Sequence, residues 1–233
     1  MPIKAIIFDK DGTLHDTEKL FFKAWHLAAE ELGVPDMDTT AHDCTGRPLQ
    51  GIARYWEEKY GGTDVVGFDV YLPVRQKYFN RLIAEEIPLK AGAIELLAAL
   101  RERGYKIGLA TSSPWDDAAD HLTRSGMASL FDAVVTGDMV REGKPHPDMY
   151  LLAAAKLGVD PAECVGVEDS LNGVESILAA GMRAIMVPDM IEPTPEFEAR
   201  LWARCNTLAD ILPLVETHRN DCSETVIKWR YLP

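Results

Sequence analysis

Short apolar runs alternate with helical patterns through most of the chain beyond residue 90. The runs lie at 105–110, 133–135, 164–167 and 184–187, and a similar run occupies 5–8 at the N-terminus. Continuous apolar runs are typical of strands buried on both faces, and their alternation with helices is typical of βαβ units. The pattern therefore predicts an α/β fold with a doubly wound parallel sheet and right-handed crossovers.

The helical patterns between these strands are amphipathic, and most of them stop at a glycine, which is the usual helix terminator. A less regular pattern suggests a closing helix, and a tail follows it from His218. The predicted helices are 91–103, 115–125, 148–157, 171–180 and the closing helix 206–215.

Residues 17–86 interrupt this alternation. Helical patterns occupy 18–32 and 49–60, a third runs through Val74 and Leu82 to Glu86, and 34–47 is irregular in pattern. One buried strand cannot form a sheet alone, so helices that follow it without an intervening strand indicate an insertion. We therefore expect a core domain of 1–16 and 87–215, an inserted α-helical cap domain of 17–86 and a C-terminal tail of 216–233.

The composition narrows the function classes. The chain has 233 residues, 47% apolar and 26% charged, with a net charge of −13. A strongly acidic protein is not expected to bind nucleic acid or an anionic membrane, since both require a basic face. A small phosphorylated partner stays compatible, because a metal ion and a few local cations can reverse the charge in one cleft.

The N-terminal segment and the cysteines give information on the cellular compartment of the protein. No signal-peptide pattern and no apolar run of membrane-spanning length is present in the sequence. The cysteines are scattered, without the paired spacing of zinc or redox sites, so free thiols in a reducing compartment are expected. A cytoplasmic protein, monomeric or weakly homo-oligomeric, is the resulting expectation. The cysteines are Cys44, Cys164, Cys205 and Cys222.

Two carboxylates, Asp9 and Asp11, directly follow the N-terminal strand, with Gly12 and Thr13 after them. The carboxyl ends of parallel strands are where open α/β sheets bind ligands. Two close carboxylates repel each other, and Mg²⁺, a hard cation with oxygen ligands, removes that cost. One carboxylate can then attack phosphorus while the other transfers a proton. A plain turn or helix cap is the alternative for this stretch alone.

Three further strand or loop ends carry polar groups: Thr111 with Ser112, Lys144, and Glu168 with Asp169. Each has a structural alternative when taken alone, as a helix N-cap, a solvated loop charge or an acidic first helical turn. Their occurrence together, all at one sheet edge, favours phosphoryl transfer. In that hypothesis a threonine hydroxyl binds phosphate and a lysine neutralises the transferred charge, while the acids complete a Mg²⁺ site.

The chain resembles the haloacid dehalogenase (HAD) superfamily of hydrolases with a helical cap inserted after the first strand. The resemblance rests on the segments 9–13, 143–148 and 168–173 and on Thr111. It implies Asp9 as nucleophile, Asp11 as acid/base, Thr111 and Ser112 as phosphate-binding and Lys144 as the stabilising cation. It also implies metal binding by Asp9, Asp11, Glu168 and Asp169.

Branches of the superfamily differ at single positions. Asp11 and Asp169 disfavour dehalogenation, and Asp11 also disfavours phosphonate cleavage. The remaining resemblance is to sugar-phosphate phosphatases and β-phosphoglucomutases. Arg47, after a glycine, is a candidate for a substrate's distal phosphate, but mutases carry a cap histidine where this chain has Phe21.

The sequence thus predicts a Mg²⁺-dependent phosphatase of a small metabolite, most simply a sugar phosphate, acting through an aspartyl-phosphate. A phosphosugar mutase and a non-catalytic metabolite-binding module are the alternatives. Lys10 departs from the family, which usually has an apolar residue there, and is interpreted as a local ion-pair partner. The cap candidates for substrate contact are Trp25, His26, Arg47, Trp56 and Arg75, with a core role as the alternative for the two tryptophans.

Overall fold

The computed structural model describes residues 1–44 and 49–219. They divide into two compact units, one formed by Met1–Leu14 with the chain from Lys90 onward, and the other by His15–Leu89. We call the first unit the core unit and the second the helical unit. The predicted substrate contact Arg47, Cys222 and the tail beyond residue 219 lie outside the described residues.

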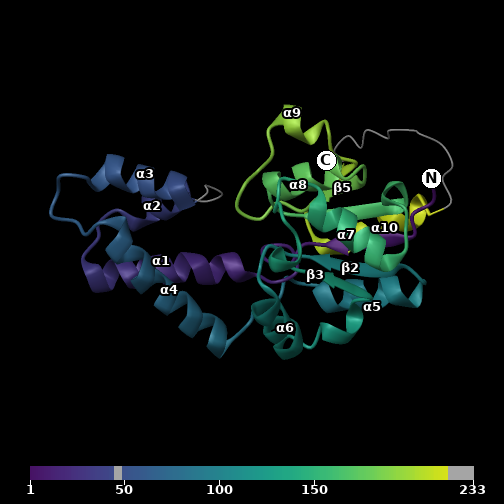
Figure 1. Ribbon diagram of the computed structural model, residues 1–233, viewed down its shortest axis with the longest axis horizontal. Coiled ribbons are helices and arrows are strands. Elements are labelled where there is room, and N and C mark those ends of the chain that lie inside the picture. The colour runs from purple at the N-terminus through teal and green to yellow at the C-terminus, as the bar shows by residue number, and fades with distance from the viewer. Residues whose placement is uncertain (45–48, 220–233) are drawn as a thin grey trace. The chain divides into compact units, whose positions relative to one another are not determined.

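The core unit is built on a parallel sheet (Figure 1). Its strands follow the order β3-β2-β1-β4-β5-β6, so the first strand is central and the chain extends the sheet first on one side and then on the other. This confirms the predicted α/β class with a doubly wound parallel sheet. The strands are β1 Ala5–Phe8, β2 Lys106–Ala110, β3 Ala133–Val135, β4 Cys164–Glu168, β5 Arg183–Met186 and β6 Ala203–Arg204.

Helices cover both faces of this sheet (Figure 1). Ala5 and Ile7 of β1 pack in one apolar cluster with residues of α7 and α8, while Ile6 and Phe8, which alternate with them, face the other side. There α5 packs on β2, and α10 packs on α5. The core-unit helices are α5 Ala93–Glu102, α6 Trp115–Arg124, α7 Asp148–Leu157, α8 Leu171–Ala179, α9 Pro195–Glu198 and α10 Ile211–Thr217.

The helical unit has its own aromatic core. Trp25 and Trp56 are only 6% and 1% exposed, and both pack against Tyr71, with ring centroids 5.4 and 4.3 Å away. The indole of Trp56 donates to the carbonyl of Val66 at 2.9 Å. The two tryptophans are therefore core residues, as their alternative interpretation held. The helices are α1 Thr17–Leu32, α2 Met37–Cys44, α3 Leu49–Tyr60 and α4 Phe68–Glu85.

Two segments of the helical unit differ from the sequence prediction. The segment predicted as irregular contains α2, in which Met37, Ala41 and Cys44 share a buried face. Its polar residues have weak helix propensity, so tertiary burial decides the structure. The last helix, α4, begins at Phe68 rather than near Val74, because Pro73 is accommodated inside it.

The C-terminal part of the core unit also differs from the prediction. The expected closing helix 206–215 is a short 3₁₀ turn, Leu208–Asp210, followed by α10. Thr207 caps this turn together with the carboxylate of Asp210, which moves the helix start forward. The two-residue strand β6 and the four-residue helix α9 are too short to produce a periodic signal.

Cys44, Cys164 and Cys205 are buried, and no disulfide joins them within residues 1–44 and 49–219. None of the helices formed by residues 1–44 and 49–219 combines the length and apolar character that a bilayer span requires.

Candidate active site

The register of the central strands brings the acidic residues together. Phe8 of β1 pairs with Val167 of β4, and the amide of Asp9 donates to the carbonyl of Val167 at 2.9 Å. The acids that follow the two strands are thereby neighbours. Carboxylate oxygens of Asp9, Glu168 and Asp169 all lie within 4.8 Å of one another.

Lys144 is the cation of this cluster. Its side chain is 8% exposed, and its ammonium donates to Oδ1 of Asp9 at 2.5 Å, to Oε1 of Glu168 at 2.6 Å and to the carbonyl of Ala110 at 3.1 Å. These contacts use all three donors of the ammonium. Although burial opposes the charge, Asp9 and Glu168 hold the pKa of Lys144 well above its ordinary value.

Glu168 is fixed by the start of α8. Its Oε2 accepts from the amides of Asp169 and Ser170, both at 3.0 Å, and from the Ser170 hydroxyl at 2.9 Å. The same hydroxyl caps α8 by accepting from the amide of Gly173. With one oxygen held by this loop and the other by Lys144, Glu168 orients the lysine and the neighbouring Asp169.

Asp169 lies against the loop that follows β1. Thr13 donates to its Oδ1 at 3.0 Å. Gly12 has a φ of +82°, and a Cβ there would overlap the Asp169 carboxylate. Glycine is therefore required at this position both for its backbone conformation and for the close approach.

The charges in this cluster are not balanced. Burial first, and then the neighbouring acids, raise the pKa of Asp9 to about 7, although Lys144 opposes the shift. Burial, Glu168 and Asp9 likewise raise the pKa of Asp169 well above its ordinary value. Three carboxylates against one ammonium, on rigid elements, fit a hard divalent cation such as Mg²⁺, which would bind their oxygens and remove this excess of negative charge.

The Asp11 carboxylate has other partners. Lys10 donates to it at 2.9 Å, and the hydroxyl of Ser113 donates to its Oδ2 at 3.0 Å. The predicted ion pair of Lys10 is thus present. The Lys10 ammonium also lies 3.1 Å from Nδ1 of His121, whose pKa is lowered by burial and by this lysine.

The other predicted phosphate-binding residues lie after β2. Thr111 is buried, and its hydroxyl accepts from the amide of Ser113 at 3.2 Å. It occupies the strand end next to β1, since Phe8 pairs with Leu109. Ser112, the next residue, is exposed. The Ser112 side chain is therefore accessible to a ligand at the same sheet edge as Asp9.

No role was predicted from the sequence for four residues that contact the acids or lie directly against them: Thr13, Ser113, Ser170 and Gly173. Each of them follows a predicted strand within a few positions, so their place in the sequence could have marked them as candidates for the site. Their hydroxyl and glycine types are nevertheless common in turns and caps, and only the fold shows which acid each one contacts.

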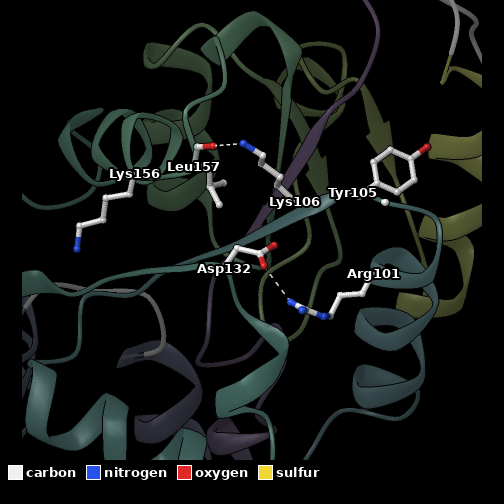
Figure 2. Close-up of a pocket in the computed structure, with 7 residues that line it drawn as sticks. Arg101, Tyr105, Lys106, Asp132, Lys156 and Leu157 are labelled. Carbon is white, nitrogen blue, oxygen red and sulfur yellow. Dashed lines mark hydrogen bonds and ion pairs between the residues drawn. The ribbon is translucent and has the colours of Figure 1, made fainter.

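A separate hollow of about 410 Å³ lies at the opposite, amino-terminal edge of the sheet (Figure 2). Its cations are already engaged within the chain: Arg101 pairs with Asp132 at 3.0 Å, and Lys106 donates to the carbonyl of Leu157 at 2.5 Å. None of the predicted catalytic residues lines this hollow. It is therefore not the candidate active site.

Comparison with known proteins gives the family. The chain matches the haloacid dehalogenase-like hydrolase family over residues 3–181. It is 36% identical to hexitol phosphatase B of Escherichia coli (strain K12) over 196 residues, which cover 80% of this chain and 84% of that protein. It is 35% identical to β-phosphoglucomutase of Bacillus subtilis (strain 168) over 198 residues, covering 79% and 83%.

A solved structure of an HAD family hydrolase from Deinococcus radiodurans R1, with bound phosphate and sodium, superimposes with a TM-score of 0.79 at 28% identity. The match covers 93% of this chain and 96% of that one. The predictions of the superfamily and of a hydrolase are confirmed by these matches. The chain belongs to the haloacid dehalogenase-like hydrolase family.

Proposed function

We propose that this protein is a Mg²⁺-dependent phosphatase of a phosphorylated carbohydrate and forms an aspartyl-phosphate intermediate. The observation that carries the proposal is the position of Lys144 between Asp9 and Glu168, with Asp169 in the same cluster. A nucleophilic carboxylate beside a fixed ammonium and a cation-binding set of acids is the arrangement that phosphoryl transfer requires.

In the first step an oxygen of Asp9 attacks phosphorus, and the bond to the leaving oxygen breaks. Asp11, in its protonated form, gives its proton to that oxygen. Lys144 neutralises charge that develops between Asp9 and the phosphoryl group, and the Thr111 hydroxyl donates to a phosphoryl oxygen. When bound, Mg²⁺ supplies further electrostatic stabilisation of the phosphoryl oxygens.

In the second step water attacks the phosphorus of the aspartyl-phosphate and gives a proton to the Asp11 carboxylate. The bond between phosphorus and the Asp9 oxygen breaks, which releases inorganic phosphate and restores the Asp9 carboxylate. Asp11 has then returned to its protonated form, so the two steps form a closed cycle.

The names of two relatives support a phosphorylated carbohydrate as substrate, since one acts on a hexitol phosphate and the other on a phosphoglucose. Similarity to the β-phosphoglucomutase also keeps mutase activity as a candidate function. Phe21 argues for the phosphatase: its ring stacks on Phe79 with centroids 4.0 Å apart. It cannot replace the histidine that the mutase resemblance requires, because a phenyl ring transfers no proton.

We propose no binding partner other than the substrate, a small phosphorylated metabolite. A cytoplasmic location and a monomeric or weakly homo-oligomeric state stay predictions from the sequence, as does binding of the distal part of the substrate by Arg47.

The test is phosphate release from a panel of sugar and sugar-alcohol phosphates, with Mg²⁺ and with a chelator. The proposal predicts metal-dependent release from one or a few of them. Isomerisation of β-glucose 1-phosphate in the presence of a bisphosphate primer, without net phosphate release, would establish the mutase instead. Binding of these compounds without either reaction would support the non-catalytic module.

A further inference from the structure

Lys10 is among the largest fully buried residues of the described part of the protein, with 0% of the whole residue exposed. A buried ammonium is costly unless it is paired and hydrogen-bonded. Its position between the two aspartates of the catalytic loop makes the identity of its partners informative about the reaction.

The partners of Lys10 are specific. The ammonium lies 2.9 Å from Oδ1 and 2.8 Å from Oδ2 of Asp11, so it contacts both carboxylate oxygens. Its third neighbour is Nδ1 of His121, at 3.1 Å. A lysine ammonium only donates, so Nδ1 accepts and the imidazole proton lies on Nε2. His121 therefore supports the lysine from α6, which is far away in the sequence.

The Asp11 carboxylate is thus held from two sides. Lys10 contacts both of its oxygens from within the core, and Ser113 donates to Oδ2 from the turn after β2. The side chain of Asp11 is 33% exposed while that of Lys10 is 1% exposed. The lysine is consequently behind the carboxylate and away from solvent, where it orients Asp11 without being available to a substrate.

We propose that Lys10, supported by His121, is a positioning residue that orients Asp11 for proton transfer to and from the reacting oxygens. This inference rests on the proposed phosphatase function and adds a role for two residues outside its catalytic set. General acid–base catalysis depends on placing the transferring oxygen within hydrogen-bond reach of the proton. The two-oxygen contact restricts rotation of the carboxylate, which a neutral residue of the same size cannot do.

A role of Lys10 in positioning Asp11 can be distinguished from other roles because the two chemical steps depend on Asp11 to different extents. With 4-nitrophenyl phosphate the leaving group is stable as an anion, so breaking its bond to phosphorus does not require a proton from Asp11. Attack by water on the aspartyl-phosphate still requires Asp11 as base. A displaced Asp11 should therefore slow the second step and leave the first step largely intact.

In the experiment, the full-length protein is mixed rapidly with Mg²⁺ and 4-nitrophenyl phosphate, and the release of nitrophenolate is followed. The kcat and KM are then measured at steady state. The variants are Lys10→Met, which keeps length and removes the charge, and Asp11→Asn as the reference. Lys106→Met is the matched control, since it removes an engaged lysine at the opposite edge of the same sheet.

We expect Lys10→Met to lower kcat by at least about tenfold with KM changed by less than about twofold. It should release nitrophenolate in a burst approaching about one equivalent per protein before the slow phase, and Asp11→Asn should show the same burst. Lys106→Met should retain the wild-type kcat. His121→Phe should show a smaller decrease of kcat with the same burst, and it carries the test if Lys10→Met does not fold.

Wild-type turnover with an unchanged kcat in Lys10→Met would overturn the inference. So would a folded Lys10→Met protein that loses the burst together with turnover, because the first step would then depend on Lys10. Absence of Mg²⁺-dependent nitrophenolate release by the wild-type protein would instead contradict the proposed function itself.

Discussion

Gly173 lies directly against the carboxylate of Glu168, so that a Cβ at position 173 would overlap Oε1. The same carboxylate oxygen accepts from Lys144 at 2.6 Å. The absence of a side chain at one helical position thus determines where the cation of the candidate active site lies.

Gly173→Ala is expected to reduce both stability and activity. Alanine has the better helix propensity by about 1 kcal/mol, but the overlap forces Glu168 or α8 to move at a cost of about 1–3 kcal/mol. Displacement of Lys144 should lower kcat by about 100-fold. Denaturant unfolding and phosphate release measure the two effects.

The double variant Gly173→Ala, Glu168→Asp supplies the control, because the shorter acid leaves room for the methyl group. The combined loss of stability should be smaller than the sum of the two single losses. Additive losses would show that the overlap with Glu168 is not the cause.

Mg²⁺ should stabilise the protein more at about pH 8 than at about pH 6. The pKa of Asp9 is raised from 3.8 to about 7 in the fold without metal. Because the folded pKa of Asp9 is the higher one, the metal-free fold loses stability as the pH rises from 3.8 to about 7. Below about pH 7, protons also compete with the metal for this carboxylate. The apparent Mg²⁺ affinity should fall about tenfold between about pH 8 and about pH 6, which thermal unfolding with Mg²⁺ or chelator measures.

Asp169→Asn tests the same excess of negative charge by removing one of the three carboxylates. Removing this carboxylate should raise the Tm of the chelated protein, since burial and neighbouring acids raise its pKa, and should abolish the increase of Tm with Mg²⁺. A Tm increment equal to that of the wild-type protein would remove Asp169 from the metal site.

His26 links α1 to α2 in a way that depends on pH. Its Nδ1 lies 2.7 Å from the carbonyl of Phe22 and its Nε2 2.6 Å from Oδ1 of Asp38. Both contacts need a proton on the ring nitrogen, so the imidazolium satisfies them together. The Phe22 carbonyl and, less strongly, Asp38 raise the pKa of His26 above 6.5, although its partial burial opposes them.

The stabilisation from His26 should be fully present below pH 6.5, its ordinary pKa, and lost as pH rises through the higher folded value. An NMR titration of the imidazole should give a pKa above 6.5 in the wild-type protein, and one closer to 6.5 in Asp38→Asn. A pKa unaffected by Asp38→Asn would contradict the contribution of the ion pair.

The central features of the fold were predictable because they have local signals. The run before Asp9 and the run before Glu168 are apolar without interruption, as parallel strands buried on both faces require. Once both are strands of one parallel sheet, the positions of the two acids follow from topology. Helix ends at Gly33 and Gly158 were predictable too, since both adopt the left-handed conformation that glycine favours.

Features that depend on distant contacts were not predictable. Lys10 and His121 are 111 positions apart, and no local pattern connects them. The helix of residues 37–44 has weak propensity and depends on its buried face. The sequence indicated which residues stand at the strand ends, while the hydrogen bonds of Ser113 and Thr13 required the packed fold.

The nucleophilic role of Asp9 is tested most directly by Asp9→Asn, because the amide has nearly the size of the carboxylate but does not attack phosphorus. The measurement is phosphate release from the best substrate of the panel, with Mg²⁺, together with thermal unfolding. We predict a folded protein whose activity has fallen by at least about 1000-fold. A folded Asp9→Asn protein with wild-type phosphate release would contradict the account.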